Sequence, residues 1–163
     1  MKTGIVIEST GSHYVVLTPE GRTLETKLRG KLRLNGSRTT NPVAVGDRVR
    51  YEETAGTGAT ITEVEPRRNY LIRRASNLSK EAHVIASNLD RALIVATLFS
   101  PVTNTEFIDR FLVTCEAYAI PAAIVLNKVD LAARRPEELE EFTAIYETAG
   151  YPVYPVSATE GSG

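Results

Sequence analysis

The stretch Ala122-Ala123-Ile124-Val125-Leu126-Asn127-Lys128-Val129-Asp130 decides the fold of the second half of this chain. Its five leading apolar residues are typical of a short strand buried within a parallel sheet. Polar residues that directly follow such a strand lie at its carboxyl end, where open parallel sheets bind their ligands. The stretch therefore predicts a strand over residues 122–126 and a binding loop over residues 127–130.

The segments around this strand alternate between strand and helix patterns. Residues 91–97 form a second apolar run, which we expect to be a strand buried on both faces. Residues 152–156 read as a short third strand. Strands that alternate with helices in this way predict a parallel sheet with right-handed crossovers.

Two helices are expected to connect these strands. Thr103 and Glu106 have the spacing of a capping box, and an apolar stripe follows on one helical face: Phe107, Ile108, Phe111, Leu112, Cys115 and Ala119. The second helix is predicted over residues 137–149, after Pro136 and before a capping Gly150. Four of its residues are expected to face inward: Leu139, Phe142, Ile145 and Tyr146.

The first half of the chain reads differently, as a series of short strands separated by turns. The predicted strands cover residues 4–8, 13–18, 22–29, 46–52 and 59–65. Five short strands in so few residues indicate a small closed barrel, for which the OB-fold is the obvious candidate. An SH3-like barrel would give almost the same pattern, so both barrels remain open at this point.

Composition excludes several classes of protein. Of the 163 residues, 42% are hydrophobic and 24% charged, which is typical of a globular protein. No apolar run reaches the ~18–20 residues of a membrane span, and no secretory signal is visible at the N-terminus. The single Cys115 excludes an intramolecular disulfide and favours a reducing, cytoplasmic location. Two histidines, His13 and His83, cannot build a dense zinc site, so we expect surface or structural roles for them.

Charge is distributed unevenly between the two halves. Residues 1–80 contain 14 Lys and Arg against 8 Asp and Glu, whereas residues 81–163 contain 5 against 12. A basic half suits a polyanion such as RNA, because Lys and Arg displace counterions from phosphates. The candidate RNA-binding residues are Lys27, Arg29, Lys31, Arg33, Arg38, Arg48, Arg50, Arg67, Arg68, Arg73 and Arg74, with Lys80 nearby. Tyr14, Tyr51 and Tyr70 are candidate stacking surfaces for bases, or else core residues.

The polar residues after the second and third strands have the chemistry of a guanine site. The carboxylate of Asp130 can accept hydrogen bonds from both N1–H and the 2-amino group of guanine, and adenine offers neither donor there. Asn127 can bridge the base edge and neighbouring loops, while the stem of Lys128 can lie along the base. After the third strand comes Ser157-Ala158, and the backbone N–H of Ala158 is a candidate donor to the 6-oxo group of guanine.

Asn127-Lys128-Val129-Asp130 and Ser157-Ala158 resemble the fourth and fifth motifs of the GTPase superfamily. A phosphate loop of the Gly-x-x-x-x-Gly-Lys-[Ser/Thr] type is absent upstream, which resembles the circularly permuted GTPases. The resemblance is close to the ribosome small-subunit-dependent GTPase A family and covers essentially all of the chain. It includes residues 66–73, 86–90, 107–112 and 125–131.

The resemblance implies an OB-fold RNA-binding domain at residues 1–66, a basic linker at 67–80 and a partial circularly permuted P-loop GTPase domain at 81–163. It implies that the phosphate loop, the Mg²⁺-linked switch regions and a Zn²⁺-binding domain follow Gly163, so we expect a truncated chain. The intact protein would be a monomeric GTP hydrolase stimulated by the small ribosomal subunit, acting in late maturation and touching ribosomal RNA. These 163 residues alone are expected to be inactive, with no bound cofactor, and to self-associate.

Two alternatives remain open at this point. The first is a non-catalytic RNA-binding module in which the second half serves as a scaffold. The second is a guanine-nucleotide-binding regulator that does not hydrolyse GTP. Turnover of GTP with and without small ribosomal subunits would separate all three.

Overall fold

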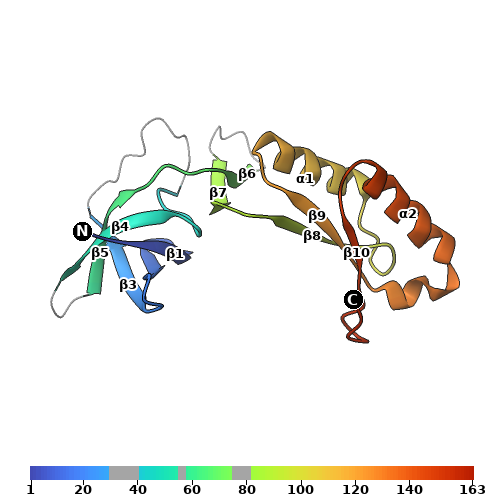
Figure 1. Cartoon of the computed structure of the whole chain (residues 1–163), viewed down its shortest axis with the longest axis horizontal. Helices are drawn as coiled ribbons and strands as arrows, with labels where there is room; N and C mark the ends of the chain where they lie inside the picture. The colour runs from blue at the N-terminus through green and yellow to red at the C-terminus, as the bar shows by residue number, and fades with distance from the viewer. Residues whose placement is uncertain (30–40, 55–57, 75–81) are drawn as a thin grey trace. The chain divides into compact units, whose positions relative to one another are not determined.

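The elements of the chain fall into two compact units, Met1–Leu89 and Asp90–Gly163. The structure, a computed structural model, describes residues 1–29, 41–54, 58–74 and 82–163 (Figure 1). None of the helices in these described ranges is long and apolar enough to cross a membrane.

Five strands of the first unit close into a barrel. They are β1 (Lys2–Thr10), β2 (His13–Leu17), β3 (Thr23–Leu28), β4 (Arg48–Thr54) and β5 (Gly58–Val64). Their order around the barrel is β1-β2-β3-β5-β4, with β3 and β5 parallel and the other adjacent pairs antiparallel. This strand order, with its one parallel pair, confirms the OB-like barrel.

Alternate residues of these strands fill the barrel. The core cluster consists of Val6, Tyr14, Val16, Val43, Val49, Tyr51, Ala59 and Ile61. Tyr14 and Tyr51 belong to it and are almost completely buried, so of the two alternatives for them the core role holds and base stacking does not. Gly4 also has a steric role, because a Cβ there would lie 2.4 Å from Val16 Cγ1.

A two-stranded hairpin completes the first unit. Strands β6 (Tyr70–Arg74) and β7 (Ala82–Ser87) pair antiparallel, and β6 lies in the segment 67–80 that we expected to be a linker. The buried carboxylate of Asp47 joins the hairpin to the barrel: it accepts from Arg67 Nε at 2.7 Å and from Ser87 Oγ at 2.6 Å. Gly46, at φ 89°, permits this approach, since a Cβ would meet the Ser87 carbonyl oxygen at 2.0 Å.

The second unit is a parallel sheet with two helices. Strands β8 (Ala92–Thr97), β9 (Ala122–Asn127) and β10 (Val153–Pro155) lie in the order β10-β9-β8. Helix α1 (Thr105–Ala117) connects β8 to β9, and the 3₁₀ helix η1 (Val129–Arg134) and α2 (Pro136–Thr148) connect β9 to β10. The core cluster consists of Ile94, Ala96, Ile108, Leu112, Ile124, Leu126, Phe142, Tyr146 and Val153.

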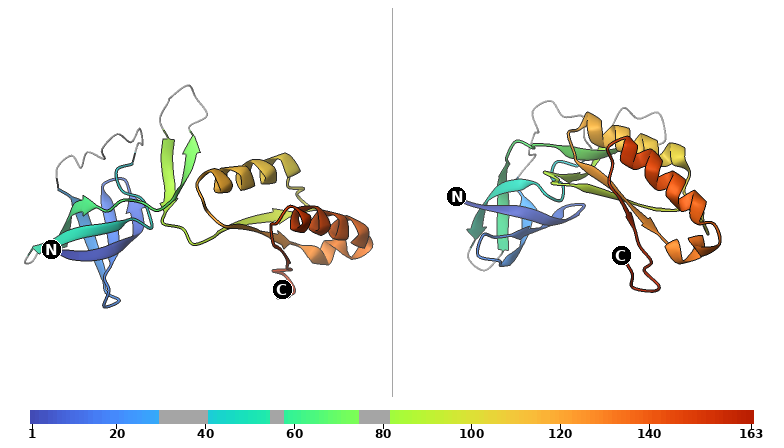
Figure 2. Two further views of the ribbon diagram at one scale, coloured as in Figure 1. Left: turned by 45° about the horizontal axis from the view of Figure 1, so that its top comes forward. Right: turned by 45° about the vertical axis from the view of Figure 1, so that its right-hand side comes forward.

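Both helices cover the same face of this sheet, as Figure 2 shows. The two crossovers step across the sheet in the same direction, and right-handed crossovers of one direction place their helices on one face. On the other face, Leu93 is 55% exposed and Val95 is 63% exposed. The prediction that this strand is buried on both faces is therefore wrong for the residues that the structure describes.

Helix α1 begins differently from the prediction. Its N-cap is Asn104, whose side chain accepts from the backbone N–H of Glu106 at 2.8 Å, so Thr103 does not form the predicted capping box. Ile108, Leu112 and Cys115 are buried as expected, but Phe107 is exposed.

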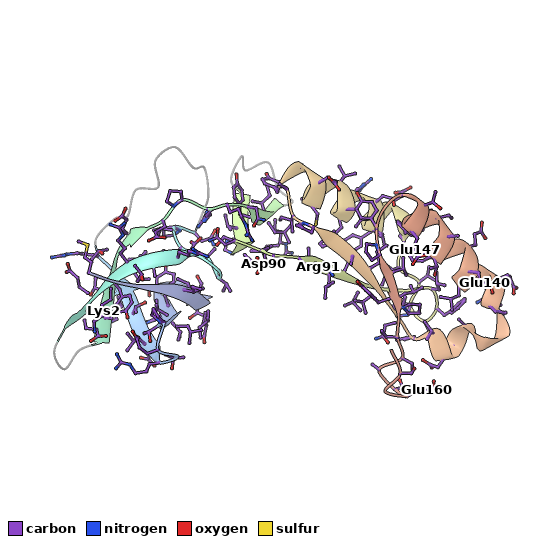
Figure 3. All side chains as sticks on the ribbon, viewed as in Figure 1. Lys2, Asp90, Arg91, Glu140, Glu147 and Glu160 are labelled. Atoms are coloured by element: carbon purple, nitrogen blue, oxygen red, sulfur yellow. The ribbon has the colours of Figure 1, made fainter. Side chains whose placement is uncertain are left out.

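Helix α2 begins with Pro136 in its first turn, as predicted, and Gly150 follows its C-cap with a φ of 92°. Phe142 and Tyr146 are buried, whereas Ile145 is exposed, contrary to the prediction. Glu140 and Glu147 are also exposed on this helix (Figure 3).

Candidate guanine site and basic surface

The carboxyl ends of β9 and β10 lie side by side and bring the two predicted motifs together. Val153 pairs with Ile124 and Pro155 with Leu126, so the strands end at nearly the same level. Beyond the strands, the Val156 N–H donates to the Leu126 carbonyl at 2.9 Å and the Val129 N–H to the Val156 carbonyl at 3.2 Å. The loops that begin at Asn127 and at Ser157 are thus held against one another by their own backbones.

Asn127 links the two loops through its side chain. Its Oδ1 accepts from the Lys128 backbone N–H at 2.8 Å and from the Ala158 backbone N–H at 3.1 Å. Because both bonds use the amide oxygen, the Nδ2 group remains as the donor that Asn127 can offer to a ligand. The Ala158 N–H, which we considered as a donor to guanine, has an intramolecular partner here.

Asp130 is held by the second loop. Its Oδ1 accepts from Ser157 Oγ at 2.6 Å, and Ser157 is completely buried. The Ser157 hydroxyl in turn accepts from the Glu160 backbone N–H at 3.3 Å. A carboxylate has about four lone-pair positions, so Asp130 keeps acceptor capacity for a ligand after this bond is made.

Lys128 occupies the left-handed region, with φ 64° and ψ 36°. Its backbone bonds Asn127, and its Nζ donates to the carbonyl oxygen of Ser100 in the loop after β8. This partner was missed by the sequence analysis. No sequence signal indicates it, because the acceptor is a main-chain carbonyl 28 residues away.

The arrangement can discriminate between bases. Asn127 presents an amide donor and Asp130 presents carboxylate acceptors from the same loop, which Ala158 and Ser157 of the second loop hold in place. A guanine edge combines ring acceptors with N1–H and 2-amino donors, so it can satisfy both groups; adenine would set its N1 acceptor against the carboxylate. In the ranges that the structure describes, no group of three or more His, Cys, Asp or Glu side chains could hold a metal ion.

The predicted RNA-binding residues divide into two groups on the barrel unit. Arg29 pairs with Glu52 at 3.0 Å, and Arg50 pairs with Glu63 at 3.4 Å and with Glu65 at 3.7 Å. Arg67 is largely buried against Asp47, with its side chain only 11% exposed. The Arg67 guanidinium is therefore not placed to contact RNA, because it holds the hairpin to the barrel.

Lys27 lies apart from these ion pairs. It lines a hollow of about 510 Å³ together with Gly11, Ser12, His13, Tyr14, Leu28 and Pro42. The β2–β3 register places Tyr14 opposite Thr26, which puts His13 and Lys27 on the same outer face. No carboxylate lies within ion-pair distance of Lys27 among the residues whose positions are described.

The remaining candidates are distributed as follows. Arg48 and Arg73 are exposed, on β4 and β6. Arg68 is tied to the backbone, because its Nη2 donates to the Leu89 carbonyl at 2.9 Å. Lys31, Arg33 and Arg38, the side chain of Arg74, and Lys80 lie outside the described residues.

Comparison with known proteins places both halves of the chain in one family. The RsgA N-terminal domain matches residues 3–61, and the RsgA GTPase family matches residues 64–163. The "Small ribosomal subunit biogenesis GTPase RsgA" of Porphyromonas gingivalis is 49% identical over 163 residues, covering 98% of this chain and 52% of that protein. The "Small ribosomal subunit biogenesis GTPase RsgA 2" of Bacteroides thetaiotaomicron is 50% identical with the same coverage.

Solved structures agree with this assignment. YloQ, described as a circularly permuted GTPase, aligns with a TM-score of 0.73 at 28% identity over 98% of this chain and 52% of its own. YjeQ from Thermotoga maritima aligns with a TM-score of 0.76 at 32% identity over 99% and 54%. The chain spans about half the length of the curated relatives it matches. Its sequence and fold show that the chain belongs to the RsgA GTPase family.

Proposed function

We propose that this chain carries the guanine-recognition and RNA-binding parts of a cytoplasmic GTP hydrolase that acts in late maturation of the small ribosomal subunit and is stimulated by that subunit. The observation that carries the proposal is that Asn127 and Asp130, on one loop, are each held by a residue of the second loop: Ala158 N–H donates to Asn127 and Ser157 Oγ donates to Asp130. The similar proteins are themselves named small ribosomal subunit biogenesis GTPases.

Base recognition follows from fixed donors and acceptors. Asp130 would accept from N1–H and the 2-amino group, while the Nδ2 of Asn127 would donate to an acceptor on the same base. Since Ser157 and the backbone of Lys128 and Ala158 hold these side chains in advance, little ordering remains for the ligand to impose. Adenine would leave the carboxylate facing an acceptor, and unpaired polar groups of this kind give strong discrimination.

Phosphoryl transfer needs groups beyond this site. Catalysis of this reaction rests on a phosphate loop with its lysine and on Mg²⁺, and the sequence of 163 residues contains no Gly-x-x-x-x-Gly-Lys-[Ser/Thr] segment. GTP and GDP with Mg²⁺ are therefore proposed as ligands of the full-length gene product. We also propose that a further domain of that product binds Zn²⁺. The chain of residues 1–163 is proposed to bind the base without turnover.

A swap of base specificity tests the guanine site. Binding of GDP, ADP and xanthosine diphosphate to the full-length gene product would be measured by calorimetry, for the wild type and for Asp130→Asn. Xanthine carries an oxo group where guanine carries the 2-amino group, so an amide donor at position 130 should favour it. We expect the wild type to prefer GDP and Asp130→Asn to prefer xanthosine diphosphate. Equal binding of all three nucleotides by the wild type would overturn the assignment.

The barrel is proposed to contact ribosomal RNA through its exposed, unpaired cations. Lys27 borders a hollow without an acid in its lining, whereas Arg29 and Arg50 are paired with glutamates. OB-folds commonly bind oligonucleotides on the face of their second and third strands, which is where Lys27 lies. A phosphate bound there would contact Lys27, and this contact would not require an existing ion pair to a carboxylate to break.

The contrast between paired and unpaired cations gives a direct experiment. Affinity for small-subunit RNA would be measured over a range of salt concentrations for Lys27→Gln and, as the matched control, Arg50→Gln. Loss of one phosphate contact should reduce the salt slope by about one, so we expect that change for Lys27→Gln and a smaller one for Arg50→Gln. Equal slopes for both variants and the wild type would show that RNA contacts the barrel elsewhere.

Ribosome dependence has its own test. GTP turnover by the full-length gene product would be measured with and without purified small ribosomal subunits. Strong stimulation is expected. Absence of turnover in both conditions would favour a non-catalytic RNA-binding module.

A further inference from the structure

The loop between β8 and α1, residues 98–104, lies beside the candidate guanine site and has no role in the base recognition described above. Thr97, the last residue of β8, is paired with Asn127, the last residue of β9. The loop therefore starts one strand away from the motif that begins at Asn127. Its carbonyl at Ser100 accepts from the Nζ of Lys128.

Two threonines close the base of this loop. The Thr103 N–H donates to the Thr97 carbonyl at 2.8 Å, and the Thr97 N–H donates to Thr103 Oγ1 at 3.0 Å. The hydroxyl of Thr97 also donates to the carbonyl of Pro101, the residue directly after Ser100. The side chain of Thr97 thus holds the segment whose carbonyl meets the lysine.

The loop is anchored at a second point. Phe99 is 8% exposed, and the guanidinium carbon of Arg135, at the end of η1, lies 4.3 Å from the centre of its ring. Arg135 also bonds Glu138 at 2.9 Å, which ties it to the first turn of α2. A loop fixed at its base and at Phe99 presents a carbonyl in a defined place, which a freely moving loop would not do.

We propose that Thr97 is a positioning residue for guanine binding: through the 98–104 loop it holds the Ser100 carbonyl against the Lys128 ammonium and so keeps the lysine stem extended beside the base site. The inference rests on the proposed guanine site and adds to it the element that orders Lys128. A lysine side chain has many rotamers, and fixing it before the base arrives removes part of the ordering cost of binding. Thr97 acts through the loop and Lys128 without touching the nucleotide.

The test compares Thr97→Val, which keeps the shape and removes the hydroxyl, with Thr97→Ser, which keeps the hydroxyl. GDP affinity of the full-length gene product would be measured by calorimetry for both, for Lys128→Met, and for the Thr97→Val/Lys128→Met double variant. We expect Thr97→Val to weaken binding about three- to tenfold, as for one long side chain that must be ordered on binding. Thr97→Ser should bind close to the wild type, and Thr97→Val should cause no further loss in the Lys128→Met background.

Amine labelling gives a second readout without nucleotide. The rate of acetylation of Lys128 would be followed by mass spectrometry, with the exposed Lys27 as internal reference. Lys128 should react faster in Thr97→Val than in the wild type and in Thr97→Ser. An unchanged rate in Thr97→Val, or an equal loss of GDP affinity with and without Lys128, would overturn the positioning role. If the wild type binds no GDP, the guanine assignment fails, and the labelling rates still decide whether Thr97 holds Lys128.

Discussion

At the scale of single residues, a dense hydrogen-bond network surrounds the carboxylate of Asp47 in the first unit. Its carboxylate is completely buried and accepts from both Arg67 Nε and Nη2 at 2.7 Å, from the Ala44 N–H at 2.8 Å and from Ser87 Oγ at 2.6 Å. Burial of a charge is favourable only when such partners replace water. This network joins the barrel to the β6–β7 hairpin through a single carboxylate.

Removal of one partner should therefore be costly. Arg67→Met leaves a buried carboxylate without its counter-charge, and we expect a loss of about 3–5 kcal/mol in the free energy of unfolding. The control is Arg50→Met, because the exposed Arg50 pairs should contribute only about 0–1 kcal/mol. Urea unfolding followed by circular dichroism would measure both. Equal losses for the two variants would contradict the role of the Asp47 network.

A second residue-scale prediction concerns alkaline pH. Burial and the hydrogen bond from Tyr146 Oη to Asp109 Oδ1, at 2.9 Å, raise the pKa of Tyr146 to about 12. The folded state therefore favours the neutral phenol. This stabilisation is complete below the unfolded-state pKa of about 10 and is lost as the pH rises from there to about 12.

The matched variant is Tyr146→Phe, which keeps the ring and removes the ionisable group. The difference in the free energy of unfolding between wild type and Tyr146→Phe should be constant up to about pH 10 and should shift against the wild type between pH 10 and 12. Thermal unfolding at a series of pH values would measure it. A difference that does not change across this window would contradict the raised pKa of Tyr146.

At the scale of elements, the start of α1 depends on one cap. Asn104 has extended backbone angles, and its side chain accepts from the Glu106 N–H. Thr103 is engaged with Thr97 instead, which explains why the capping-box spacing did not apply. The spacing identified the correct helix end but placed the cap one residue early.

Substitutions at Asn104 test whether its side chain caps the helix. Asn104→Ala should lower the free energy of unfolding by about 1 kcal/mol, because an N–H of the first turn loses its acceptor. Asn104→Asp keeps an acceptor near the positive end of the helix and should be close to the wild type. The thermal midpoint of the helical circular dichroism signal would show this. Equal midpoints for Asn104→Ala and Asn104→Asp would argue against Asn104 as the cap.

At the scale of the whole molecule, the sheet of the second unit has an apolar face that neither helix covers. Leu93 and Val95 are exposed on it, and the register places Val95 beside Val125 and Val125 beside Tyr154, which is 43% exposed. Among the described strands, β8 also has a neighbour on one side alone. Contiguous apolar surface and open strand edges both favour association.

We therefore expect the chain of residues 1–163 to self-associate with rising concentration. Val95→Lys should weaken this association, because it places a charge in the centre of the apolar row. Ile145→Lys is the control, since Ile145 is 57% exposed on α2, away from that row. Sedimentation velocity over a concentration series would measure the effect. A wild type that stays monomeric at all concentrations would contradict the prediction.

Part of the fold and of the site could be read directly from the sequence. The barrel strands, the three parallel strands and both helices follow from hydrophobic periodicity, which depends on neighbouring residues alone. Asn127, Asp130 and Ser157 could be placed together because they lie in the loops after two strands of one parallel sheet, and the carboxyl ends of such strands meet at one edge. The position of the proposed guanine site could therefore be predicted from short stretches of the sequence.

The tertiary structure decided what depends on distant partners. Arg67 belongs to a basic cluster in the sequence, but in the fold its side chain is largely buried and bonds Asp47, which lies 20 residues away in the chain. Lys128 donates to the backbone carbonyl of Ser100, and residue types in the sequence do not predict a main-chain partner of this kind. The apolar run 91–97 shows that a strand is buried but cannot show on how many faces; the handedness and direction of both crossovers decide that. Sequence thus determined the barrel strands, the parallel strands and both helices, whereas the β6–β7 hairpin was not predicted. The packing of the elements against one another determined which charged and apolar groups stay available.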